Sequence, residues 1–179
     1  MPSAKTDDNP AVAITMGSDS DLPTLIPGIK FLKDLGVKVE VRILSAHRTP
    51  IEMIEFAKTA KSKGIQVIIA GAGGAAHLPG MIASLTSIPV IGVPVKTKAL
   101  SGVDSMYSIL QMPGGIPVAT VAIGGGLNSG ILAAKILALS DKTIEKKLSF
   151  YKNKLHQNII EKDKLLLELG PEKYLEKFN

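Results

Sequence analysis

The run VKVEVRILSAHRTPIEMIEFAKTA at residues 37–60 reads as a strand, a polar loop and a helix, the repeating unit of an α/β fold. Residues 37–43 are rich in β-branched side chains and predict a buried strand, and residues 52–60 predict a helix. Between them, Thr49-Pro50-Ile51-Glu52 has the spacing of a capping box, with proline at the first helical position. The loop before this helix therefore lies at the carboxyl end of a strand, where α/β sheets bind ligands.

The same alternation of strand and helix runs along most of the chain. Apolar runs predict four further strands, at residues 11–16, 65–70, 88–93 and 116–123. Helical periodicity predicts helices at residues 22–35, 103–111 and 131–139. Glycine-rich loops follow the first, third and fifth strands, at residues 17–21, 71–81 and 124–130. This order predicts a parallel sheet with helices on both faces, and we expect the loops after strands one, two, three and five to converge on one crevice.

The composition indicates one soluble α/β domain with an aliphatic core. The chain has 179 residues, of which 45% are hydrophobic and only 4% aromatic. There is no cysteine, which excludes disulfides and fits a reducing, cytoplasmic setting. No apolar run is long enough to span a bilayer, and we expect no membrane association. The net charge of +5 is spread over the chain without a basic stripe, which disfavours nucleic acid as a partner.

The chain divides into three predicted segments. Residues 1–10 are polar and are expected to form a flexible N-terminus, and residues 11–140 form the α/β catalytic domain. Residues 141–179 form a C-terminal helical extension, in which a long helix predicted at 141–168 carries an apolar stripe. Because this helix follows the completed sheet, it either packs on another subunit or folds back on its own domain.

Two loops carry the candidate chemistry. In the loop after the second strand, Ser45 is a hydrogen-bonding hydroxyl, His47 can exchange a proton near neutral pH, and Arg48 offers a planar fork of donors for a phosphate or carboxylate. A histidine and an arginine before a capped helix can also be no more than an exposed turn. In the loop after the first strand, Ser18 can hold a phosphate at a helix start, or the acidic residues beside it simply cap that helix.

Several common sites are excluded by the sequence. Gly71-Ala72-Gly73-Gly74-Ala75-Ala76 matches a dinucleotide-binding pattern, but the next strand ends at Lys96 without the carboxylate that holds the ribose. No glycine loop has the form of a P-loop, and no serine lies in a nucleophile elbow. The three histidines lack the spacing of metal ligands, so we expect no metal site. A phosphate-sized anion site beside a single histidine remains.

Five longer motifs stand out, at residues 16–21, 45–50, 70–81, 102–105 and 111–115. Their combination resembles the class I N5-carboxyaminoimidazole ribonucleotide mutases of de novo purine (IMP) biosynthesis over about residues 11–155. A related enzyme carboxylates aminoimidazole ribonucleotide directly with carbon dioxide and has lysine after the histidine, where this chain has Arg48.

The resemblance implies a flavodoxin-like three-layer α/β/α sandwich with a central parallel sheet, which assembles as a homo-octamer and uses no metal or organic cofactor. It implies an isomerase that moves the carboxylate of its ribonucleotide monophosphate substrate from the exocyclic nitrogen to ring carbon C4. His47 would be the catalytic acid and base. The substrate-binding residues would be Ser18 and Arg48 at the phosphate, Asp21 at the ribose, and Ser45, Gly73 and His77 around the carboxylated imidazole.

Three alternatives stay open at this point. The first is a carboxylase that uses carbon dioxide directly. The second is a non-catalytic nucleotide- or flavin-binding module, and the third is an oligomeric scaffold built on the C-terminal helix.

Overall fold

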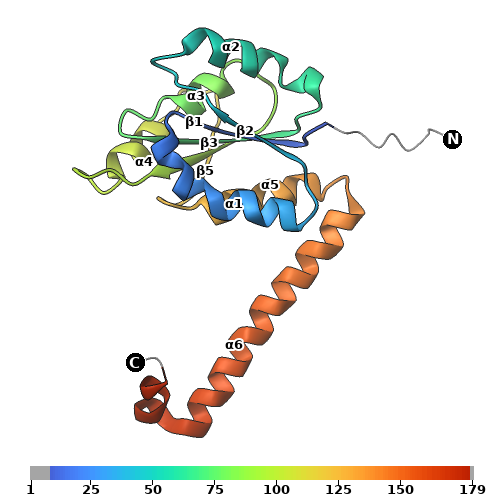
Figure 1. Ribbon diagram of the computed structural model, residues 1–179, viewed down its shortest axis with the longest axis vertical. Helices are drawn as coiled ribbons and strands as arrows, with labels where there is room; N and C mark the ends of the chain where they lie inside the picture. The colour runs from blue at the N-terminus through green and yellow to red at the C-terminus, as the bar shows by residue number, and fades with distance from the viewer. Residues whose placement is uncertain (1–8, 178–179) are drawn as a thin grey trace, which may run out of the picture. The chain divides into compact units, whose positions relative to one another are not determined.

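The computed structural model describes residues 9–177 and contains a five-stranded parallel sheet with the strand order β2-β1-β3-β4-β5 (Figure 1). This is the strand order of flavodoxin-like folds, so the predicted fold class is confirmed. In chain order the strands are β1 (Val12–Met16), β2 (Val39–Ile43), β3 (Val67–Gly73), β4 (Val90–Val95) and β5 (Ala119–Thr120).

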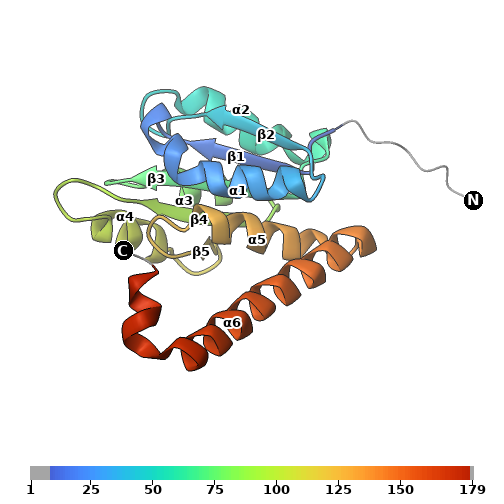
Figure 2. The ribbon, with the colours of Figure 1, turned by 60° about the horizontal axis from the view of Figure 1, so that its bottom comes forward.

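Helices cover both faces of the sheet and complete the three layers. α1 and α5 lie side by side on one face, and α2 and α3 lie on the other (Figures 1 and 2). The structure forms two compact units, and the first, which ends at Leu137, contains the sheet. Its helices are α1 (Leu22–Asp34), α2 (Pro50–Thr59), α3 (Leu78–Ala83), α4 (Val103–Leu110) and α5 (Gly126–Leu137). Two short 3₁₀ turns, η1 (Asp19–Asp21) and η2 (Lys61–Lys63), complete the list.

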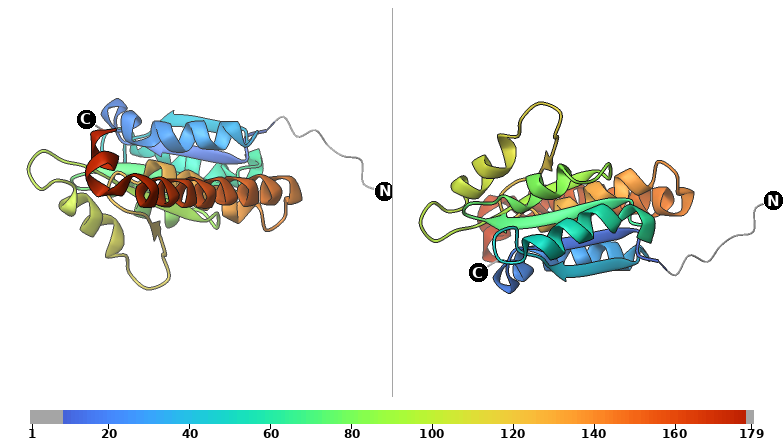
Figure 3. Two further views of the ribbon diagram at one scale, coloured as in Figure 1. Left: turned by 90° about the horizontal axis from the view of Figure 1, so that it is seen from below. Right: turned by 90° about the horizontal axis from the view of Figure 1, so that it is seen from above.

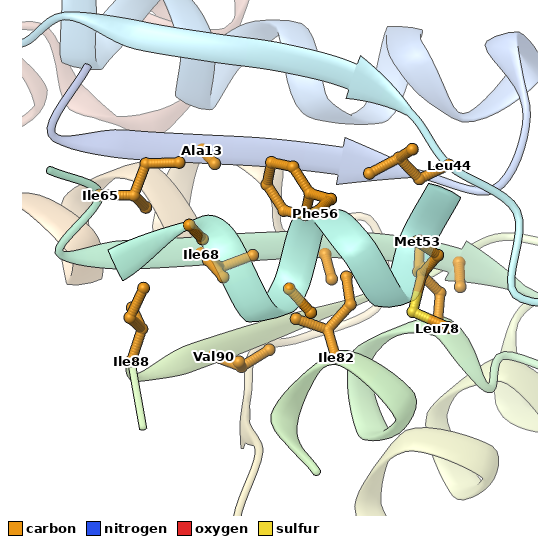
Figure 4. Close-up of a cluster of buried hydrophobic side chains, with 14 of the residues drawn as sticks. Ala13, Leu44, Met53, Phe56, Ile65, Ile68, Leu78, Ile82, Ile88 and Val90 are labelled. Carbon is orange, nitrogen blue, oxygen red and sulfur yellow. The ribbon is translucent and has the colours of Figure 1, made fainter. Parts of the chain in front are cut away.

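The core under α2 and α3 is aliphatic, as the composition predicts. Figure 3 (right) looks onto this face, with α2 lying over the strands. Met53 and Phe56 of α2 belong to one cluster of buried side chains with Ala13 and Ile68 of the strands and Ile82 of α3 (Figure 4). All five are at most 3% exposed. This packing anchors the starts of α2 and α3 and fixes the loops that precede them.

Two of the glycines at residues 124–130, Gly126 and Gly130, belong to α5 and serve its packing on α1. Gly126 begins α5, and a Cβ there would collide with the carbonyl oxygen of Thr24 in α1. A Cβ on Gly130 would lie 2.8 Å from the backbone of Gly28. The backbones of α1 and α5 approach so closely that side chains larger than hydrogen do not fit between them.

Two further strand predictions are wrong at their boundaries. The fifth strand was predicted over residues 116–123, but only Ala119–Thr120 pairs with β4. Residues 71–73 were predicted to open a loop, but they continue β3 and pair with β4 as far as Gly73 and Val95. The reason is that glycine and alanine are tolerated in a strand whose neighbours supply the packing, so composition alone placed the strand end too early.

A second compact unit begins at Ala138 and contains α6 (Lys142–Glu176). Asp141 caps this helix, because its Oδ1 accepts hydrogen bonds from the backbone N–H groups of Thr143 at 2.8 Å and Ile144 at 3.2 Å. The helical backbone is interrupted at Gly170, which has φ 72°, close to the predicted helix end. No helix among residues 9–177 is both long and apolar enough to cross a membrane. The first eight residues of the predicted flexible N-terminus lie outside the described part of the chain.

Candidate active site

A cavity of about 510 Å³ lies at the carboxyl ends of β1 to β4. The loops after these four strands line it, because parallel strands present their carboxyl ends at the same edge of the sheet. The structure brings all of the sequence-predicted site residues to this cavity, namely Ser18, Asp21, Ser45, His47, Arg48, Gly73 and His77. The loop after β5 was predicted to reach it and does not; the loop after β4 takes that place.

The loop after β1 forms a closed capping box around η1. Ser18 is the N-cap, and its Oγ accepts a hydrogen bond from the backbone N–H of Ser20 at 3.4 Å. The Oδ2 of Asp21 accepts from the backbone N–H of Ser18 at 3.2 Å. The capping interpretation is correct only in part, because the N-cap is Ser18 and Asp21 is the third residue of its box; both side chains still lie at the cavity wall.

Asp21 is a buried carboxylate, with only 8% of its surface exposed. Burial raises the pKa of Asp21 above its ordinary value of 3.8, while hydrogen bonds from the backbone of Ser18 and Gly17 and the charge of Arg48 act in the opposite direction. Ionisation of Asp21 therefore lowers the stability of the folded protein.

We expect Asp21→Asn to raise the melting temperature, because asparagine occupies the buried position without a charge. Because the folded pKa of Asp21 is raised, the folded protein binds this proton more tightly than the unfolded chain. The stability of the wild type therefore falls as the pH rises from the pKa of Asp21 in the unfolded chain to its higher pKa in the folded protein. The Asn variant has no ionisable group at this position, so its stability does not fall in this way. Melting curves between pH 3 and 8 should diverge with increasing pH; Asp34→Asn, on the exposed surface of α1 and away from the cavity, is the control.

The loop after β2 is tied into a turn by its own side chains. Ser45 donates its backbone N–H to Oγ1 of Thr49 at 2.9 Å, and the backbone N–H of Thr49 donates to the carbonyl of Ser45 at 3.0 Å. The predicted capping box between Thr49 and Glu52 is therefore absent, because both groups that Thr49 would contribute already bond to Ser45. The turn holds His47 and Arg48 at the cavity.

Arg48 links the first and second loops. Its Nη2 donates to the carbonyl oxygen of Gly17 at 2.6 Å, and its Nε lies 3.4 Å from Oγ of Ser45. The side chain is exposed on the cavity side, so its remaining N–H groups are available to an anion. This geometry suits a phosphate bound between the two loops.

His47 and His77 are in direct contact across the cavity wall. Nε2 of His47 lies 2.8 Å from Nδ1 of His77, and the two rings are nearly perpendicular, at 82°. The residues are thirty positions apart in the chain, but β2 and β3 flank β1 on either side, so the loops after them meet. Sequence spacing gave no sign of this pair.

The loop after β3 is held by two serines that the sequence analysis did not assign. Oγ of Ser105 accepts the backbone N–H of Gly74 at 2.9 Å and donates to the carbonyl of Val95 at 2.7 Å. Oγ of Ser108 donates to the carbonyl of Gly74 at 3.1 Å. Both serines lie on one face of α4, three residues apart. This spacing is the sequence feature from which a shared contact could have been predicted.

We expect Ser105→Ala to destabilise the protein by about 1–3 kcal/mol, because the N–H of Gly74 and the carbonyl of Val95 lose their partner in a buried setting. Turnover should fall as well, since the loop that carries His77 loses its anchor. Denaturant unfolding and steady-state kinetics measure the two effects. Ser149→Ala on the exposed surface of α6 is the control, and equal stability of both variants would contradict the anchoring role.

The fourth wall of the cavity comes from the loop after β4, which contributes Lys96, Thr97 and Lys98. Thr97 is fixed there, since its Oγ1 donates to Asp104 at 2.8 Å and accepts the N–H of Gly102 at 3.2 Å. From the sequence, Lys96 was noted only because it stands where dinucleotide-binding proteins have a carboxylate. Together with Arg48, the two lysines make the cavity predominantly cationic, which favours an anionic ligand. Among residues 9–177, no three His, Cys, Asp or Glu side chains are grouped as a metal site would require.

Comparisons with known proteins agree with this geometry. A family model described as AIR carboxylase matches residues 11–158. The chain is 55% identical to the N5-carboxyaminoimidazole ribonucleotide mutase of Synechocystis over 97% of its own length and 99% of that protein. It is 52% identical to the phosphoribosylaminoimidazole carboxylase of Saccharomyces cerevisiae, covering 29% of that longer protein. The crystal structure of Treponema denticola PurE superposes with a TM-score of 0.80 at 32% identity, covering 88% of this chain and 98% of that one.

The fold and the cavity define a flavodoxin-like α/β protein with a cationic cavity at the carboxyl edge of its sheet. Within that class, the chain belongs to the AIR carboxylase family. The resemblance inferred from the sequence motifs is confirmed.

Proposed function

We propose that the protein is an N5-carboxyaminoimidazole ribonucleotide mutase, an isomerase of de novo purine biosynthesis. The observation that carries this function is the 55% identity to a mutase over nearly the full length of both chains. The cationic cavity supports it, because a ribonucleotide monophosphate with an added carboxylate is strongly anionic. Arg48 after His47, where the direct carboxylase has lysine, favours the mutase over that alternative.

The residues divide between binding and chemistry. Ser18 and Arg48 bind the phosphate between the first two loops. Asp21 binds the ribose hydroxyls, since a carboxylate facing the phosphate would be repelled. Ser45, Gly73 and His77 line the part of the cavity that takes the carboxylated imidazole.

His47 performs the proton transfers. It donates a proton to the exocyclic nitrogen, the carbamate N–C bond breaks, and carbon dioxide is released beside the ring. Carbon C4 then attacks carbon dioxide, and His47 removes the proton from C4, which restores aromaticity and the starting protonation state. One imidazole suffices because it exchanges protons near neutral pH in both directions. The cavity contributes confinement, because released carbon dioxide must stay against the ring.

The protein assembles as a homo-oligomer, which we propose to be an octamer in the cytoplasm. The C-terminal extension, residues 141–179, packs between subunits of this assembly, and residues 11–140 form the catalytic domain. The exposed apolar residues of α6 support this role, since Phe150, Ile159 and Leu167 are 73%, 62% and 78% exposed. Such side chains on one helix are suited to burial against another copy of the chain.

The test supplies N5-carboxyaminoimidazole ribonucleotide without ATP, metal or bicarbonate and follows the carboxylated product. Formation of 4-carboxy-5-aminoimidazole ribonucleotide at a rate independent of bicarbonate is the expected result. A requirement for aminoimidazole ribonucleotide and bicarbonate would instead establish a direct carboxylase. Binding without any product would establish a nucleotide-binding module.

A further inference from the structure

The hydrogen bond between His47 and His77 determines which ring nitrogen of His47 is available for chemistry. Nε2 of His47 is engaged with Nδ1 of His77 at 2.8 Å. Within the described part of the chain, Nδ1 of His47 and Nε2 of His77 have no hydrogen-bond partner. The nitrogen of His47 left for a substrate is therefore Nδ1.

A bond between two ring nitrogens couples the tautomers of the two histidines. One nitrogen must carry the hydrogen and the other must offer a lone pair. When His47 is an imidazolium, both of its nitrogens carry hydrogen, so Nδ1 of His77 has to be the acceptor. A proton on Nδ1 of His77 would then place two N–H groups against each other. The charged form of His47 is therefore compatible only with neutral His77 protonated at Nε2.

We propose that His77 is a positioning residue that holds His47 in its Nε2–H tautomer through the whole reaction, so that Nδ1 both gives and takes the proton. This inference rests on the proposed function. In the first half, Nδ1–H of His47 gives its proton to the exocyclic nitrogen, which also keeps the electron pair of the breaking N–C bond. In the second half, C4 forms its bond to carbon dioxide and the C4 proton passes to the lone pair on Nδ1. His77 neither gains nor loses a proton.

The surroundings of His77 are built to keep it in place without a ligand. Gly74, three residues earlier, is bonded at its N–H by Ser105 and at its carbonyl by Ser108. The backbone N–H of His77 donates to Ala75 at 2.9 Å, and its carbonyl accepts from Met81 at 3.0 Å in the first turn of α3. A partner that orients a catalytic histidine through its second nitrogen is a general device in enzymes and metal sites.

The test compares His77→Asn, whose Oδ1 lies where Nδ1 of His77 lies and can accept from Nε2–H of His47, with His77→Phe and His77→Leu, which cannot. We expect kcat to fall about 10–100-fold in Phe and Leu, the range for loss of an orienting partner, with little change in KM. His77→Asn should recover most of this loss. Both His77→Phe and His77→Leu remove the acceptor, so a folding defect in one of them does not decide the outcome.

The second readout is the ¹⁵N NMR spectrum of the histidine rings, which needs no turnover. We expect neutral His47 of the wild type and of His77→Asn to carry hydrogen at Nε2, and His77→Phe to show a mixture of both tautomers. His156 on the exposed surface of α6 is the internal reference and should not change. An Nδ1–H tautomer of His47 in the wild type, or an unchanged tautomer and kcat in His77→Phe, would overturn the inference. Failure of the proposed function would instead abolish wild-type turnover and leave the spectrum as expected.

Discussion

His47→Asn is expected to retain the fold and to lose at least about 10²–10⁴-fold in kcat, the usual contribution of a general acid and base. Asparagine is smaller than histidine and polar, so it fits the exposed position of His47, although its amide ends short of the Nε2 position that bonds His77. It cannot carry a proton that it gives up near neutral pH. Steady-state kinetics with N5-carboxyaminoimidazole ribonucleotide measures the loss, and circular dichroism with thermal melting verifies the fold.

The matched control is His156→Asn, which makes the same substitution on the exposed surface of α6. It should leave kcat and melting temperature unchanged. Substantial turnover in His47→Asn, with the His156 variant also active, would remove His47 from the proton transfers. The proton donor would then have to be sought among the other cavity residues.

The polar residues at the carboxyl strand ends were predictable from the sequence, because parallel topology forces the ends of β1, β2 and β3 to one edge. Ser18, Arg48 and His77 therefore meet at one cavity although they belong to three separate loops. The topology follows from strand and helix order, which the apolar pattern encodes directly. The motifs then identified which of these loops carries the chemistry.

The contacts between the loops were not predictable, because they depend on geometry that no local pattern records. Thr49 bonds to Ser45 and not to the helix that it precedes, although its spacing is that of a capping box. Ser105 reaches Gly74 from a helix thirty-one positions later in the chain. Residues 124–130 look like another glycine loop by composition, yet Gly126 already belongs to α5 and allows the close approach of this helix to Thr24 of α1. Composition alone does not separate a glycine that admits a ligand from one that admits another helix.

Arg48→Ala is expected to raise the KM about 10–100-fold with a smaller effect on kcat. A hydrogen bond to a charged group contributes about 1.5–3 kcal/mol, and each 1.4 kcal/mol corresponds to tenfold in affinity. The substitution also removes the bond from Nη2 to the carbonyl of Gly17, so the first loop loses its link to the second. Kinetics at constant ionic strength, together with titration of inorganic phosphate as an inhibitor, measures the loss of the phosphate site.

Two comparisons separate charge from geometry at this position. Arg48→Lys keeps the positive charge but lacks the planar fork, so it cannot bond Gly17 and Ser45 while facing a phosphate, and we expect it to recover only part of the affinity. Arg42→Ala removes the other arginine of the chain, which pairs with Glu40 on the outer strand β2, and should leave KM unchanged. An unchanged KM in Arg48→Ala would contradict the phosphate role. Full recovery by lysine would mean that the cavity recognises phosphate through net charge alone, with no contribution from the link between the two loops.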